Sequence, residues 1–176
     1  MDNVLRRRKH NEFTWDSIGD IEQGRGDLGV DMPVLVYRLM QFTLLDVLTR
    51  EFGLERANNF FRDAGFLAGR SYAENVLDLT VNLDTFIQNL HESLKELKVG
   101  ILRIESLNRE SGEMTMTVAD DLDCSGLEIT QENVCIYDEG FIAGILKAYS
   151  GVDYTVREVD CWASGDRVCR FHASPA

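Results

Sequence analysis

The chain has 176 residues, of which 44% are hydrophobic, and this is enough for one globular domain with a single core. Its 18 Lys and Arg residues stand against 30 Asp and Glu residues, and the resulting net charge of -12 excludes nucleic acid and anionic membrane as default partners. The apolar stretch from Pro33 to Leu48 contains Arg38 and Asp46 and is too short and too polar to cross a bilayer. We expect a cytoplasmic protein whose four cysteines are reduced or bound to metal.

Residues 1–27 are predicted to form an N-terminal tail with a short strand, and residues 28–176 a single domain. The tail carries a basic cluster, residues 6–9, with no apolar segment after it. A secretory signal needs such a segment, so the cluster indicates a solvated tail. A contact with lipid or nucleic acid is the alternative for this cluster.

Three helices are predicted next, over residues 33–52, 54–77 and 83–97. In the first, Asp31 is the expected cap, Pro33 the first turn, and a broad apolar stripe is typical of a core helix. In the second, Gly65 and Gly69 lie on one face. Two small residues four apart allow either close packing between helices or a wall that faces a ligand.

The third helix has the clearest amphipathic pattern, with Asn82 or Asp84 as its cap and Gly100 at its end. Beyond it the hydrophobic period changes, which predicts a hairpin of residues 101–107 and 114–118.

A fourth helix is then expected over residues 133–149. A second hairpin, within residues 153–171, should turn at Ser164-Gly165-Asp166. Helices followed by hairpin, helix and hairpin predict an α+β fold with helices packed on a small antiparallel sheet.

Three cysteines in this last part form a candidate metal site. A hairpin centred on Gly165 would place Cys161 opposite Cys169, at a separation that suits two zinc-bound thiolates and also suits a disulfide. Cys135 precedes the fourth helix, where the helix dipole favours the thiolate form that metals require. The alternative is that these thiols are small buried hydrophobes.

The fourth ligand is left open by the residues themselves. Cys124 would complete a shell of four thiolates, as in closed structural zinc sites. Glu158 lies three residues before Cys161, so it would face away from the site unless the strand bends or bulges. His172 has the same geometric difficulty, and water is a further candidate.

Three segments resemble a known family. Residues 158–171 (EVDCWASGDRVCRF) are similar to the C-terminal signature of the 4-vinyl reductase domain family, also described as predicted hydrocarbon-binding proteins. Residues 135–144 (CIYDEGFIAG) resemble the family's entry into a glycine-rich helix, and residues 33–39 (PVLVYRL) resemble its first long helix. The resemblance covers most of the chain from about residue 28.

This resemblance implies the fold shared by sensory domains of aromatic-responsive bacterial activators and by transport-protein-particle tethering subunits, usually as a homodimer. It also implies a structural zinc held by three cysteines and a glutamate, here Cys135, Cys161, Cys169 and Glu158. Members with a cysteine at the position of Cys124 would use that residue instead. The zinc would clip the C-terminal hairpin to the fourth helix.

The function we predict is a sensor or binding module for an apolar small molecule, either a hydrocarbon or an aromatic compound. Phenol sensors of this kind hold the ligand hydroxyl with a His and a Trp, whereas this chain offers Met114 and Met116, so a more apolar or larger ligand is expected. The residues predicted to line the pocket are Phe42, Phe60, Phe86, Met114, Met116, Tyr137 and Phe141.

The alternative is a reductase-type enzyme, or an accessory subunit, acting on a tetrapyrrole or a similar apolar substrate. The sequence has no G-x-G-x-x-G fingerprint after a strand and no motif that pairs a nucleophile with a base. The absence of these enzyme signatures favours the binding module, and we predict no catalytic residues.

Overall fold

The computed structural model describes residues 12–176 and divides the chain into two compact units, with the boundary between Asp31 and Met32. The described part of the first unit forms a short 3-10 helix, η1 (Trp15–Ser17), and the one-turn helix α1 (Ile21–Gly24). Residues 12–27 contain no strand, and the basic cluster lies outside the described residues.

The second unit begins with the long helices α2 (Val34–Phe52) and α3 (Leu54–Val76). Helix α2 starts one residue later than predicted, with Pro33 in the capping position and in extended conformation, so Asp31 is not its cap. Gly53 alone joins the two helices and has a positive φ of 81°, which favours glycine. None of the helices in residues 12–176 has the length and apolar character that a membrane span requires.

The stripe on α2 was predicted to enter the core, and this prediction is wrong. Gln41 is the one buried residue of α2, whereas Leu35 is 69% and Met40 is 62% exposed. An apolar stripe shows only that a helix face avoids water, so it does not distinguish a core from an interface with another molecule.

Helix α5 (Ile136–Ser150) crosses α3 at very close range, and four glycines make this possible. A Cβ atom on Gly65 would lie 2.1 Å from the carbonyl oxygen of Tyr137, and one on Gly144 would lie 2.3 Å from that of Phe66. Gly69 and Gly140 show the same conflict with the facing backbone. The glycines of α3 therefore serve helix packing, the first of the two predicted alternatives.

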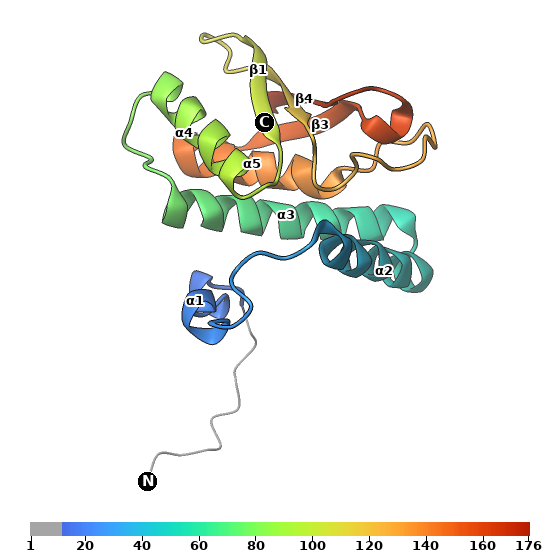
Figure 1. The fold of residues 1–176 in the computed structure, drawn as a ribbon. Coiled ribbons are helices and arrows are strands. Elements are labelled where there is room, and N and C mark those ends of the chain that lie inside the picture. Colours follow the sequence, from blue (N-terminus) through green and yellow to red (C-terminus); the bar gives the residue numbers. More distant parts are fainter. Residues whose placement is uncertain (1–11) are drawn as a thin grey trace. The chain divides into compact units, whose positions relative to one another are not determined.

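Helix α4 (Leu83–Glu96) begins as predicted, because the Asn82 side chain accepts a hydrogen bond from the backbone N–H of Thr85 at 3.1 Å. It ends before Gly100, and Lys98 takes the left-handed conformation (φ 59°) that reverses the chain. Helix α5 lies between the sheet and α3, and α4 packs against β1 (Figure 1).

The sheet contains four antiparallel strands in the order β1-β2-β4-β3. Their bounds are β1 (Ile101–Leu107), β2 (Met114–Ala119), β3 (Tyr154–Asp160) and β4 (Cys169–Pro175). Both predicted hairpins are present, and Gly165 (φ 107°) lies in the predicted turn of the second. Pairing of β2 with β4 joins the hairpins into one sheet, which confirms the predicted α+β architecture.

Candidate metal centre and ligand cavity

Four cysteines from four different segments meet at one end of the sheet. Cys169 begins β4 and pairs with Val118 of β2, so its side chain is on the sheet face that carries the buried Val118. Cys135 caps α5, Cys161 directly follows β3, and Cys124 lies in the loop after β2. All four are free thiols and are 0% or 1% exposed.

The spacing of the sulfur atoms fits a single tetrahedral ion. The Sγ atom of Cys135 lies 3.8 Å from that of Cys161 and 3.7 Å from that of Cys169. Four thiolates around zinc, each with a Zn–S bond of about 2.3 Å, have sulfurs about 3.8 Å apart. The remaining close pair, Cys124 and Cys169, is 3.0 Å apart and would open slightly around an ion. All four sulfurs lie within 4.8 Å of one another, so they are close enough to hold a metal.

One geometric premise of the sequence prediction is wrong, because Cys161 and Cys169 are not cross-strand partners. Strand β3 ends at Asp160, which pairs with Arg170. Cys161 then caps a 3-10 helix, η2 (Trp162–Ser164), whose Ser164 hydroxyl accepts the Cys161 N–H at 2.9 Å. The two thiols therefore converge through this turn.

Glu158 lies beside the cysteines but outside the group of four. Strand β3 has a register shift between Glu158 and Asp160, as ligation by Glu158 would require, and Glu158 pairs with Phe171 on the same sheet face as Cys169. Its Oε2 atom accepts the backbone N–H of Cys135 at 3.0 Å, while Oε1 is buried without a hydrogen-bond partner among the described residues. Burial raises the pKa of Glu158 to about 8. The exposed His172 is not in the group of four.

The loop that carries Cys124 is fixed by helix α2. Arg38 donates hydrogen bonds to the carbonyl oxygens of Leu122 (2.8 Å) and Ser125 (2.9 Å). The Tyr37 hydroxyl donates to Oδ1 of the buried Asp123 at 2.7 Å. Burial raises the pKa of Tyr37, so the hydroxyl keeps the proton that it donates. Helix α2 therefore fixes the position of the loop that carries Cys124.

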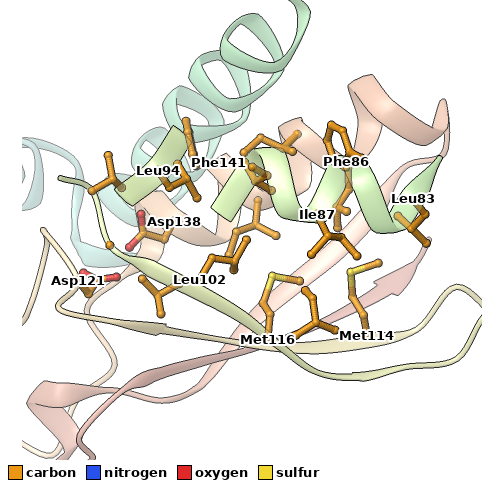
Figure 2. A pocket seen from close by; sticks show the side chains of 18 residues that line it. Leu83, Phe86, Ile87, Leu94, Leu102, Met114, Met116, Asp121, Asp138 and Phe141 are labelled. Carbon is orange, nitrogen blue, oxygen red and sulfur yellow. The ribbon is translucent and has the colours of Figure 1, made fainter. Parts of the chain in front are cut away.

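Next to this group, α4, α5 and the first two strands enclose an apolar cavity (Figure 2). The centre of a water-sized molecule can occupy about 60 Å³ of it, several times the roughly 10–15 Å³ that one water needs. Its lining consists of Leu83, Phe86, Ile87, Leu90, Leu94, Val99, Gly100, Leu102, Ile104, Met114, Met116, Val118, Asp121, Asp138, Phe141, Ile142, Ile145 and Leu146.

Four of the seven predicted pocket residues come together at this cavity, namely Phe86, Met114, Met116 and Phe141. Phe60 and Tyr137 line a different space, an apolar groove between α2 and α3. Phe42 lines neither of the two.

Two carboxyl groups in the cavity wall, Asp121 and Asp138, were not predicted from the sequence. Burial raises the pKa of Asp121 to about 6, with a further contribution from Asp123. Burial also raises the pKa of Asp138 well above its ordinary value, helped by the charges of Asp123 and Asp121. The chain has 30 acidic residues, most of which are expected at the surface, and the sequence does not distinguish the few that are buried.

Comparison with known proteins supports the family resemblance. The family model of the V4R domain matches residues 114–175, which span β2 to β4 and include all four cysteines. The uncharacterized protein MJ0150 of Methanocaldococcus jannaschii is 25% identical over 171 residues, covering 97% of this chain and 91% of that protein.

Solved structures share the fold. The phenol-responsive sensory domain of the transcription activator PoxR, solved with phenol, has a TM-score of 0.63 at 17% identity, covering 83% of this chain and 76% of that one. A vinyl-4-reductase family protein from Methanocaldococcus jannaschii has a TM-score of 0.58 at 15% identity and covers 85% of both chains. A trafficking protein particle complex subunit 3 from Naegleria fowleri, covalently bound to palmitic acid, has a TM-score of 0.64 at 11% identity, covering 81% and 95%.

Proposed function

We propose that this protein is a ligand-binding module for an apolar small molecule, of the kind used in sensors. The observation that carries the proposal is the cavity between α4, α5 and the sheet, because all but two of its 18 lining residues are apolar or glycine. Ligand sites are mostly apolar and largely preformed, with a few polar groups that fix orientation. Two proteins that share the fold, one solved with phenol and one covalently bound to palmitic acid, support such a role.

The four cysteines are proposed to hold a structural zinc ion. Zinc is the usual metal for four thiolates in tetrahedral arrangement, and a site with four protein ligands has no open position for a substrate. The ion would join the loop after β2, the start of α5 and the last hairpin. We assign the fourth ligand to Cys124 rather than Glu158, because Cys124 is in the group of four and Glu158 is already bonded to the Cys135 N–H. Four free thiols at such a site agree with a cytoplasmic location.

Xenon pressure on crystals tests the cavity directly, since xenon enters apolar cavities without needing polar contacts. We expect a xenon site between Phe86 and Met116. Replacing Met116 with Phe adds volume inside the cavity and should remove that site while the fold persists. A cavity that stays free of xenon in the unsubstituted protein would contradict the proposal.

We further propose that the exposed face of α2 forms a homodimer interface. Leu35, Leu39 and Met40 are all more than half exposed, and an apolar surface of this extent is typical of an interaction site. Light scattering should give twice the chain mass of 20.0 kDa. The variant Leu39→Glu should give a monomer, whereas Leu97→Glu, at the equally exposed (56%) C-cap of α4, should remain dimeric. A monomer before substitution would refute the interface.

A further inference from the structure

The apolar cavity has a single polar end. Sixteen of its 18 lining residues are apolar or glycine, and the exceptions are Asp121 and Asp138. Asp121 follows β2 by two residues, and Asp138 belongs to the first turn of α5. Figure 2 shows both carboxyl groups at the end of the cavity opposite Leu83. They therefore form one acidic site at one end of an otherwise apolar cavity.

The two carboxyl groups differ in how well their oxygens are bonded. Oδ1 of Asp121 accepts backbone N–H groups from Asp123 at 2.8 Å and from Cys124 at 3.2 Å. Oδ2 of Asp138 is buried and has no hydrogen-bond partner among the described residues. A buried carboxyl oxygen without a donor is costly, and a ligand that brings a donor to this position removes the cost.

The charged groups around the polar end of the cavity determine which kind of ligand donor fits there. No basic side chain lines the cavity. Asp121, Asp123 and Glu158 are acidic neighbours of Asp138, and Arg38, which lies near Asp123, donates its hydrogen bonds to two backbone carbonyls. Burial and neighbouring carboxyl groups raise the pKa values of Asp121 and Asp138, and neither an anionic head nor a neutral hydroxyl brings the counter-charge that their ionised forms lack. A cation with N–H donors satisfies both the free oxygen and the charge.

The shape of the cavity indicates the rest of the ligand. Its wall on α4 runs from Leu83 to Leu94, a distance of about 16 Å at the 1.5 Å rise of a helix. The volume is modest for that length, so a slender chain fits better than a wide ring system. Met114 and Met116 lie along this slot and adapt readily to a flexible chain.

We propose that the cavity is a site for a linear alkyl amine, with the ammonium group between Asp138 and Asp121 and the alkyl chain along α4 towards Leu83. This inference rests on the proposed ligand-binding function and specifies its ligand class.

Calorimetric titration with n-octylamine, n-octanol and octanoate tests the inference, because these probes differ only in the head group. We expect octylamine to bind at least about tenfold more tightly than octanol, as charge-assisted hydrogen bonds exceed neutral ones, and octanoate to bind most weakly. Equal binding of octylamine and octanol would overturn the amine assignment but leave the proposed function standing. Absence of binding by all three probes would contradict both.

Variants locate the ammonium group. Asp138→Asn should weaken octylamine binding by about tenfold or more and leave octanol nearly unchanged. The control Asp120→Asn removes the same charge from an exposed position next to Asp121, where the φ of 51° is acceptable to asparagine, and should change neither affinity. Unchanged octylamine binding in folded Asp138→Asn protein would overturn the proposal. If that variant does not fold, the octylamine-to-octanol ratio of the unsubstituted protein decides.

A metal is the competing occupant, because Asp121, Asp138 and Cys135 also lie close enough to share an ion. Protein that already carries one equivalent of zinc should bind octylamine equally well with and without a second equivalent. Displacement of octylamine by the second equivalent of zinc would assign this end of the cavity to a cation site and overturn the amine proposal.

Discussion

The cysteine group and the apolar cavity are neighbours that meet at the start of helix α5, yet they depend on sequence in opposite ways. The cysteine group depends on four sulfur atoms within 4.8 Å of one another, so the identity of each residue matters. The cavity is formed by 16 apolar or glycine residues, so total volume matters more than any one side chain. A substitution of a few atoms should therefore have very different effects in the two regions.

The largest effect is expected for Cys169→Ser, which changes one atom in the cysteine group. Loss of a thiolate should remove the bound metal and lower the melting temperature by roughly 10 °C, because metal binding contributes directly to folding free energy. Metal analysis and calorimetry of the same sample measure both. A Cys169→Ser protein with full metal content would show that the sulfur is not a ligand.

Helix α5 connects the two regions, and Gly144→Ala should disturb both. The new Cβ would lie 2.3 Å from the carbonyl oxygen of Phe66 and 2.6 Å from the backbone nitrogen of Arg70. Backbone atoms cannot move aside as a flexible side chain can, so we expect a loss of about 3 kcal/mol in unfolding free energy, measured in urea.

The matched control for that substitution is Gly24→Ala in α1, where a Cβ meets no atom within 4 Å. It should leave stability unchanged or slightly raised, since alanine favours a helix more than glycine does. An equal response of the two variants would contradict the close crossing of α3 and α5.

A smaller effect is expected for Glu158→Gln, which separates the two candidates for the fourth ligand. Glutamine keeps an oxygen that can accept the Cys135 N–H, so one metal ion per chain should remain and stability should change by less than about 1.5 kcal/mol. Loss of the metal in this variant would make Glu158 the ligand instead of Cys124.

The smallest effect is expected inside the cavity, for Met116→Leu. A swap of similar volume between apolar residues costs less than about 1.5 kcal/mol, and the metal content should not change. A destabilisation as large as that of Cys169→Ser would remove the contrast between the two regions.

Much of the fold could be predicted from the sequence, because hydrophobic period and turn residues are local signals. The α3, α4 and hairpin boundaries agree with their patterns to within a few residues, and Asn82 caps α4 as expected. The apolar stripe on α2 was misassigned to the core because a single chain does not reveal what covers an exposed face.

The candidate site was predictable only where its residues are chemically distinctive. The cysteines stand out by type, although assigning the fourth ligand to Cys124 or Glu158 requires the position of the Cys124 loop relative to strand β3. The carboxyl groups of Asp121 and Asp138 could not be found, because burial of an aspartate depends on tertiary packing and leaves no pattern in the sequence.

The most direct test of the account is native mass spectrometry of gently purified protein, combined with metal analysis. We predict one zinc ion per chain together with a bound apolar molecule. A chain that carries an oxidised cysteine pair, no metal and no co-purified molecule would contradict both the zinc clip and the ligand-binding cavity.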